Sequence, residues 1–181
     1  MTAIELVRHA KAHSREGWWG KPDTDRPLNQ AGQRQADALA VSLAGGTAVT
    51  AVVSSPYVRC TATVAPLASG RGLEVTAEQA LAEAAALPSF AADDQWIVSA
   101  WVGGRAIALI DRLVGQYPDG RVVACTHGDV IPALLAVLAG RDQVDIEHVR
   151  LRKGAWVTLD FDQGRCVKAT PHPAPDSEDD P

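Results

Sequence analysis

Short apolar runs alternate with amphipathic stretches along most of the chain, a pattern typical of a protein that mixes strands with helices. Each apolar run is bounded by glycine, proline or polar residues, as expected for buried strands. The last two runs flank the turn-forming residues 162–164 and predict a hairpin. The predicted strands are residues 3–7, 49–53, 73–75, 121–126, 155–161 and 166–169.

Between these strands, apolar residues recur at the i, i+3, i+4 and i+7 spacing of amphipathic helices. Asn29 is the predicted N-cap of the first helix. Ser55 is the predicted cap of the second, with Pro56 at its first helical position. Asp129 is the predicted cap of the helix that follows the strand at 121–126. Each strand before the hairpin is thus followed by a helix or by a loop that leads to one.

Three segments lack a clear period. Residues 11–28 predict a long loop, and long ordered loops in compact domains are often functional. Residues 78–101 predict an irregular cap or short helices, before an amphipathic helix over 106–114. The Pro-rich and acidic residues 171–181 lack core formers and predict a disordered tail. The sequence therefore predicts one folded domain over residues 1–170.

The alternation of strands and helices predicts an α/β domain with a mainly parallel central sheet and helices on both faces, a three-layer α/β/α sandwich. Such sheets bind ligands beyond the carboxyl ends of their strands. Arg8 and His9 end the first predicted strand, His127 follows a later one, and Arg59 lies one turn into a helix that follows another. We expect these side chains to meet at one edge of the sheet.

Composition narrows the classes of partner. The chain has 181 residues, 46% of them hydrophobic, and a formal net charge of −5. An acidic chain repels nucleic acid phosphates at long range, so a nucleic acid polymer is not expected as a partner. No apolar run is long enough to span a bilayer and no targeting segment begins the chain, so we expect no membrane contact and a cytoplasmic location.

Neither a disulfide framework nor a metal or cofactor site is predicted. The three cysteines are Cys60, Cys125 and Cys166, an odd number without a CxxC pair. Cys125 is predicted to be a small core residue. The histidines do not follow metal-ligand spacing. The chemistry is therefore expected to come from the protein side chains alone.

Two arginines and two histidines at strand ends suit a phosphoryl group. Arg8 and Arg59 can each present a planar fork of donors to phosphate oxygens. A neutral imidazole can attack phosphorus and carry the phosphoryl group, which divides one displacement into two steps. The arginines cluster near the amino-terminal motif with acids interleaved, which indicates a small anionic substrate.

Three motifs in this order resemble the histidine phosphatase superfamily, also called the phosphoglycerate mutase-like fold. The first is Leu6-Val7-Arg8-His9-Ala10, the second is the segment 54–63 around Arg59, and the third is Thr126-His127-Gly128. The resemblance covers roughly residues 3–160. It implies that His9 is a nucleophile that is transiently phosphorylated, and that Arg8, Arg59 and His127 complete the phosphate pocket.

The resemblance also implies a proton donor, often in a Leu-x-Glu context after the third strand. Leu81-Ala82-Glu83 matches that context, so Glu83 is the candidate acid, and Glu78 is a nearby alternative. Gly128, in the third motif, is a candidate phosphate-binding residue.

Within the superfamily, the segment from Arg8 to Ala36 resembles two groups. One is the SixA-type phosphohistidine phosphatases, and the other is the C-terminal phosphatase domain of MutT-type Nudix proteins, which act on nucleoside diphosphates. The chain departs from the second group because it contains no Nudix domain.

The loop after His9 holds further candidates. Lys11 and Arg15, with His13, are candidates to bind a second phosphate, and the alternative is surface charge. Trp18 is a candidate to stack on a base or wall the pocket, as is Trp19, and the alternative is that they pack the loop onto the domain. Arg26 is predicted to pair with Asp23 or Asp25, and His148 and His172 to be surface residues.

The predicted function is metal-independent hydrolysis of a small phosphorylated metabolite or nucleotide through a phosphohistidine on His9. One alternative is a protein phosphohistidine phosphatase, whose partner protein would need an open, shallow site. An alternative of another class is a non-catalytic phosphate-binding scaffold, which would be expected to lack His9 or one of the arginines. A mutase is a third possibility, and the small size of the chain argues against it.

Overall fold

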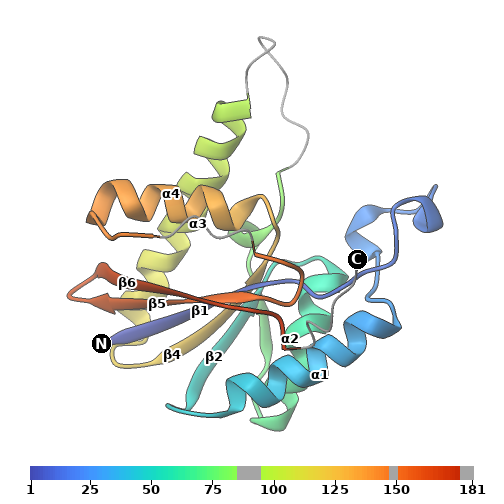
Figure 1. Ribbon diagram of the computed structural model, residues 1–181, viewed down its shortest axis with the longest axis horizontal. Helices are drawn as coiled ribbons and strands as arrows, with labels where there is room; N and C mark the ends of the chain where they lie inside the picture. The colour runs from blue at the N-terminus through green and yellow to red at the C-terminus, as the bar shows by residue number, and fades with distance from the viewer. Residues whose placement is uncertain (85–94, 147–150, 176–181) are drawn as a thin grey trace.

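The computed structural model describes residues 1–84, 95–146 and 151–175, and its centre is one six-stranded sheet (Figure 1). The strand order is β3-β2-β4-β1-β5-β6. The first four strands in this order are parallel, β5 runs antiparallel to β1, and β6 runs antiparallel to β5. The strands are β1 (Thr2–Arg8), β2 (Val49–Ser54), β3 (Val75–Ala77), β4 (Arg121–Thr126), β5 (Trp156–Asp162) and β6 (Arg165–His172).

Two pairs of helices cover the two faces of the sheet, which confirms the predicted three-layer α/β architecture (Figure 1). Helices α1 (Gln30–Ala44) and α2 (Val58–Gly70) pack on one face, and α3 (Gln95–Gln116) and α4 (Val130–Asp142) pack on the other. Successive residues of a strand point to opposite faces. Accordingly, Leu6 joins the core beneath α3 and α4, whereas Val7 joins the core beneath α1 and α2.

The predicted start of α1 is confirmed, the predicted cap of α2 is wrong, and the predicted cap position of α4 is correct although its side chain bonds elsewhere. Asn29 Oδ1 accepts a hydrogen bond from the Gly32 amide, which satisfies one free donor of the first turn. Helix α2 begins at Val58, two residues later than Pro56 predicted, and the Ser55 hydroxyl instead lies 2.8 Å from His127 Nε2. Asp129 occupies the N-cap position of α4, as predicted, but its carboxylate accepts from the Ala84 amide and makes no capping hydrogen bond to the helix. Both side chains have partners across the sheet edge that the local sequence does not reveal.

Helix α3 is longer than its sequence predicts. It begins at Gln95, inside the segment 78–101 for which the sequence predicts an irregular cap or short helices. Gly103 and Gly104 weaken a helix prediction, yet Gly103 is required by packing: a Cβ there would lie 2.8 Å from the Ala133 carbonyl oxygen of α4. The close approach of the two helices thus overrides local propensity. Residues 85–94 of the predicted irregular cap lie outside the described residues.

The carboxyl-terminal hairpin forms as predicted and extends farther. Gln163 and Gly164 both have positive φ, at 48° and 81°, which is the conformation of a tight turn that matches strand twist. Strand β6 runs to His172, and Ala174 is buried. The fold therefore continues past residue 170, where the sequence places the end of the domain. Residues 176–181 of the predicted disordered tail lie outside the described part of the chain.

A buried ion pair between β1 and β4 also contacts β5 and the end of α1, away from the predicted site. Glu5 is 3% exposed, and its Oε1 accepts from Arg121 Nε at 2.7 Å. Its Oε2 accepts from the Thr158 hydroxyl at 2.6 Å. Arg121 Nη1 also donates to the carbonyl oxygens of Leu43 and Gly45, where α1 ends. One guanidinium thus neutralises a buried carboxylate and satisfies free carbonyls of a helix terminus.

We expect Arg121→Met to lower the free energy of unfolding by about 3 kcal/mol, because removal of one partner leaves a buried charge uncompensated. Urea denaturation measures this change. Arg112→Met is the matched control, since Arg112 is half exposed and pairs with Glu78 on the surface. That control should lose less than about 1 kcal/mol. Equal losses in the two variants would show that burial of the Glu5 pair has no special cost.

Candidate active site

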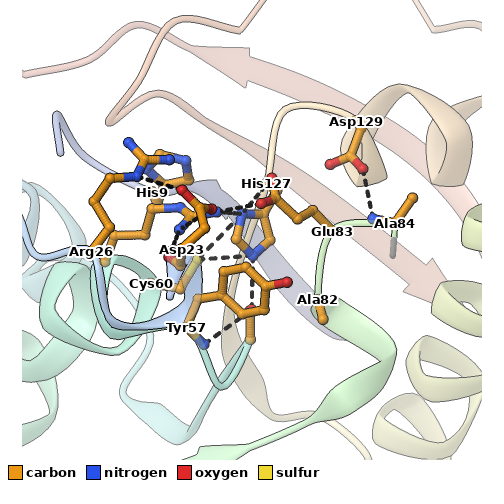
Figure 2. A network of polar contacts seen from close by, with 12 residues as sticks. His9, Asp23, Arg26, Tyr57, Cys60, Ala82, Glu83, Ala84, His127 and Asp129 are labelled. Atoms are coloured by element: carbon orange, nitrogen blue, oxygen red, sulfur yellow. Dashed lines mark hydrogen bonds and ion pairs between the residues drawn. The ribbon is translucent and has the colours of Figure 1, made fainter. Parts of the chain in front are cut away.

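The side chains predicted from the motifs meet at the carboxyl edge of the parallel strands (Figure 2). His9 follows β1, His127 follows β4, and Glu83 follows the short 3-10 turn Gln79–Leu81. Arg59 reaches the same place from the first turn of α2. Arg8, His9, Arg59 and Glu83 line one pocket of about 570 Å³. His127 lies against them, with its ring centroid 5.4 Å from that of His9.

The hydrogen bonding of His9 fixes its tautomer. Its Nδ1 lies 2.8 Å from the Ala10 carbonyl oxygen, which can only accept, so the ring proton is on Nδ1. The other nitrogen, Nε2, therefore keeps its lone pair. Burial, together with the charge of Arg59, lowers the pKa of His9 to about 3 despite the favourable bond to Ala10. His9 is a neutral imidazole with an available nucleophilic nitrogen at neutral pH.

His127 holds the opposite tautomer. Its Nδ1 lies 3.3 Å from Arg59 Nη2, and because a guanidinium only donates, Nδ1 accepts. The proton is then on Nε2, which donates to the Ser55 hydroxyl at 2.8 Å. Burial and the nearby charge of Arg59 lower the pKa of His127 to about 2, so its ring is also neutral. Tyr57 covers this ring edge-on, with centroids 4.8 Å apart.

Arg59 is completely buried and connects both sides of the pocket. Its Nη2 donates to Glu83 Oε1 at 2.7 Å. Its Nη1 donates to the Asp23 carbonyl oxygen at 2.8 Å and lies 3.1 Å from the Asp23 carboxylate. The guanidinium also lies over the Tyr57 ring, 4.6 Å from its centroid. The Nε of Arg59 is buried without a hydrogen-bond partner among the described residues.

The two carboxylates on Arg59 differ in acidity. Partial burial raises the pKa of Asp23, but the hydrogen bond from Arg26 and the charge of Arg59 outweigh it and bring the pKa to about 2. Burial raises the pKa of Glu83 above its usual range, although Arg59 opposes this. A neighbouring pair with pKa values displaced in opposite directions is a common arrangement where one acid must hold a proton. Glu83 is thus the carboxyl group better suited to donate one.

Arg8 is positioned by the third motif. Its Nη1 donates to the Leu151 carbonyl oxygen at 2.6 Å. A Cβ on Gly128 would lie 2.8 Å from both Cζ and Nη2 of Arg8. Gly128 lines the pocket and leaves the space that the Arg8 guanidinium occupies. Its absent side chain is therefore one reason for glycine at this position.

The loop over residues 11–28 is ordered and tied to the pocket. Ala12 and Leu28 pair as an antiparallel bridge that closes its base. Arg26 is 6% exposed and donates from Nε to Asp23 Oδ1 at 2.7 Å and from Nη1 to the His13 carbonyl oxygen at 2.8 Å. The predicted pairing of Arg26 is confirmed, with Asp23 as the partner. Since Asp23 also contacts Arg59, the loop and the pocket share one ionic network.

The remaining predicted residues divide by position. Arg15 lines the main pocket, with His13, whereas Trp18 lines a neighbouring cavity that shares Arg15. Lys11 is not among the residues that line either cavity. Its amide donates to Gln35 and its carbonyl oxygen accepts from the Asn29 amide, at the junction with α1.

Three residues were predicted to have no role in the site, and the structure describes two of them. Cys125 is fully buried in the core, as predicted. His172 is partly buried, not a surface residue, and its ring stacks on that of Trp156 with centroids 4.7 Å apart. His148 lies outside the described residues. Glu78, the alternative acid, pairs with Arg112 at 2.6 Å and does not line the pocket.

Asp23, Ser55 and Lys153 are polar residues of the site that no sequence motif indicates in this role. Lys153 lines the pocket because its turn is bound to the carboxyl end of β1. There the Gly154 amide donates to the carbonyl oxygens of Arg8 and His9. Burial and the charge of Arg8 lower the pKa of Lys153. Lys153 lies in a distant turn without a motif, so no local pattern could identify it.

The described part of the chain contains no group of three His, Cys, Asp or Glu side chains that could hold a metal ion. None of its helices is both long and apolar enough to cross a membrane. All three cysteines are free thiols and are buried.

The chain is similar in sequence to one protein family and to a curated protein. Residues 4–87 and 99–171 match the model of the histidine phosphatase superfamily, branch 1. A curated relative, the 8-oxo-(d)GTP phosphatase of Mycolicibacterium smegmatis, is 32% identical over 175 residues, which are 97% of this chain and 49% of the relative. The chain thus spans about half the length of that relative.

Solved structures share the fold. The Bacillus stearothermophilus protein YhfR superposes with a TM-score of 0.72 at 18% identity, covering 96% of each chain. The phosphoserine phosphatase of Entamoeba histolytica gives 0.68 at 20% identity, over 92% of this chain and 94% of the other. A mycobacterial glucosyl-3-phosphoglycerate phosphatase also gives 0.68 at 20% identity, over 93% and 96%.

We expect Gly128→Ala to displace the Arg8 guanidinium, because the added methyl group would occupy its position. If Arg8 binds the substrate phosphate, kcat/KM should fall about 100-fold, the scale for loss of one preorganised donor. The melting temperature should change little, since the side-chain end of Arg8 can move. Steady-state kinetics and thermal denaturation measure the two effects. Unchanged kcat/KM would show that Arg8 does not need this position.

Proposed function

This chain belongs to the histidine phosphatase superfamily, and we propose that it hydrolyses a small phosphorylated substrate through a phosphohistidine on His9. One observation carries the proposal: His9 is neutral, its Nδ1 is occupied by the Ala10 carbonyl, and its Nε2 remains for attack in a pocket lined by arginines. A neutral imidazole beside fixed cations is the arrangement that phosphoryl transfer to nitrogen requires.

In the first step, the lone pair of His9 Nε2 attacks phosphorus and forms the P–N bond. The bond from phosphorus to the leaving oxygen breaks, and the Glu83 carboxyl gives its proton to that oxygen. The negative charge on the three equatorial oxygens is matched by Arg8, Arg59 and Lys153, which line the pocket. A phosphate oxygen would also offer an acceptor for the buried Arg59 Nε.

In the second step, water attacks the phosphohistidine and the P–N bond breaks. The Glu83 carboxylate takes a proton from the water, so the residue that acted as acid now acts as base. The electron pair of the P–N bond returns to His9 Nε2, which restores the neutral imidazole. Inorganic phosphate is released and the site regains its starting protonation state.

His127 is proposed to orient Arg59, because its Nδ1 accepts from Arg59 Nη2 at 3.3 Å. The unprotonated Nδ1 lies 3.7 Å from Glu83 Oε2, too far for a hydrogen bond. Its own position is fixed by the Ser55 hydroxyl on the far side of the ring. Both rings being neutral avoids repulsion between two imidazolium ions and the arginines.

Small substrates are supported by the site and by the family. The pocket of about 570 Å³ has the size of a small-molecule site. The ordered loop over 11–28 gives it a wall, which favours a small molecule over a phosphohistidine on a folded partner protein. The Mycolicibacterium smegmatis relative is named for a nucleotide, which favours nucleotides as a class.

A scaffold that binds phosphate without catalysis is disfavoured, since His9, Arg8 and Arg59 are all present. The cytoplasmic location stays a prediction.

The first test is phosphate release by wild type and His9→Ala, with EDTA present. The panel holds an aryl phosphate, nucleoside mono- and diphosphates, sugar phosphates and a phosphohistidine-bearing protein. Wild type should release phosphate from a small substrate and His9→Ala should release none, because no other group can carry the phosphoryl. EDTA should not change the rate, since side-chain cations match the charge. Substantial activity of His9→Ala would overturn the nucleophile, and fastest release from the protein would favour the alternative.

A second test addresses the proton donor. Glu83→Gln should slow alkyl phosphates about 100-fold, within the usual range for general acid catalysis, and aryl phosphates much less, because aryl leaving groups need no proton. For alkyl phosphates, wild-type kcat should decline as pH rises through the raised pKa of Glu83, because only the protonated acid donates. Glu78→Gln is the matched control and should leave both rates unchanged, as Glu78 pairs with Arg112 outside the pocket. Equal slowing of both substrates by Glu83→Gln would exclude the assigned role.

A further inference from the structure

Asp129 occupies the N-cap position of α4, but its side chain binds another segment. A carboxylate at this position usually accepts from the free amides of the first turn of its own helix. Asp129 makes no such bond to the described residues of α4, and its Oδ2 instead accepts from the Ala84 amide at 3.0 Å (Figure 2). The carboxylate therefore joins the start of α4 to the segment that follows β3.

The place of this carboxylate is unfavourable for binding an anion. Asp129 lines the pocket together with Arg8, His9 and Lys153. A negative charge there opposes the binding of a phosphoryl group, because like charges repel. A structural role toward another residue of the pocket would account for a carboxylate at this place.

The segment that Asp129 binds carries Glu83, the proposed proton donor. The amide of the residue after Glu83 donates to Asp129, and the carbonyl oxygen of the residue before it accepts from Arg105 of α3. One residue farther back, the Leu81 carbonyl oxygen accepts from the Thr126 hydroxyl at 2.6 Å. Side chains from β4, α3 and the start of α4 thus hold the backbone on both sides of Glu83.

The position of this backbone matters for proton transfer. A general acid must come within hydrogen-bond distance of the leaving oxygen. Arg59 Nη2 donates to Glu83 Oε1 at 2.7 Å and holds the carboxyl end of the side chain. Because a glutamate side chain has three rotatable bonds, the reach of its carboxyl group also depends on where its backbone lies. A misplacement of about 1 Å can lower a rate by up to about 100-fold.

The two residues before Asp129 also position groups of the site. His127 Nδ1 accepts from Arg59 Nη2 at 3.3 Å. Gly128 leaves the space that the Arg8 guanidinium occupies. Together with Asp129, three consecutive residues after β4 therefore contact two arginines of the pocket and the segment that carries the acid.

We propose that Asp129 is a positioning residue for the proton donor, and that its bond to the Ala84 amide holds Glu83 where the carboxyl group reaches the leaving oxygen. The inference rests on the proposed function and assigns no proton transfer to Asp129 itself. An asparagine could make the same bond, because its side-chain oxygen also accepts, whereas an alanine could not. The role therefore requires the acceptor and not the charge.

The kinetic test compares Asp129→Ala with Asp129→Asn, a matched pair in which both variants lose the charge and only the first loses the acceptor. The quantity measured is kcat/KM for an alkyl phosphate divided by kcat/KM for an aryl phosphate, whose leaving group needs no proton. This ratio cancels the effect of the lost charge on phosphate binding. It should fall about tenfold in Asp129→Ala, because Arg59 and Arg105 still hold part of the segment, and stay within about twofold of wild type in Asp129→Asn.

Two results of this comparison would overturn the proposal. Equal ratios in the two variants would show that the acceptor has no effect. A fall in Asp129→Asn as large as that in Glu83→Gln would show that Asp129 itself donates the proton, because an asparagine cannot. In the double variant Glu83→Gln/Asp129→Ala, the ratio should equal that of Glu83→Gln alone. A further fall of about tenfold would show that Asp129 acts independently of Glu83, and would leave Glu83 as the acid.

A measurement without turnover separates this inference from the proposed function. Hydrogen exchange of the Ala84 amide, followed by NMR, should be about tenfold faster in Asp129→Ala than in wild type, the scale of one hydrogen bond to a charged group. It should change much less in Asp129→Asn. The same exchange rate in wild type and Asp129→Ala would refute the contact even if the chain is an active phosphatase. Faster exchange in Asp129→Ala, with no phosphate release by wild type, would overturn the proposed function and the positioning role with it, although the contact exists.

Discussion

The buried guanidinium of Arg59 is the group on which the arrangement of the site depends. A charge with no exposed surface is tolerated only if it is paired and hydrogen-bonded. Glu83 and Asp23 supply that pairing from two segments that are far apart in the sequence, and Tyr57 covers the guanidinium. The need to satisfy this one cation therefore brings together the loop after β1, the segment after β3 and the start of α2.

The same network shapes the chemistry that we propose. The two carboxylates in contact with Arg59 have different acidities. The pKa of Asp23, which also accepts from Arg26, is lowered, whereas the pKa of Glu83 is raised by burial. The buried cation also disfavours protonation of His9 and His127, which adds to the effect of burial on each ring. A neutral nucleophile and a protonatable acid thus follow from one buried arginine and its partners.

The sheet separates this region from a second buried ion pair. Arg121 begins β4, holds the end of α1 and binds Glu5 in the middle of β1, whereas the pocket lies where the parallel strands end. Hydrophobic cores on both faces lie between them. Stability at one end and chemistry at the other can therefore be altered independently, which is consistent with the way parallel sheets generally position their ligand sites.

The sequence by itself determined the α/β alternation, most strand bounds and the convergence of Arg8, His9, Arg59 and His127, because apolar periodicity and charged residues near strand ends are local signals. Glu83 was a candidate only through the family resemblance. Only the tertiary structure decided the partners of Ser55 and Asp129. Both residue types commonly cap helices, but here their side chains bond across the sheet edge. The tertiary structure also decided the presence of Lys153 in the pocket, the tautomers of both histidines and the tie between Asp23 and Arg59. These depend on distances between segments remote in sequence, which no local pattern encodes.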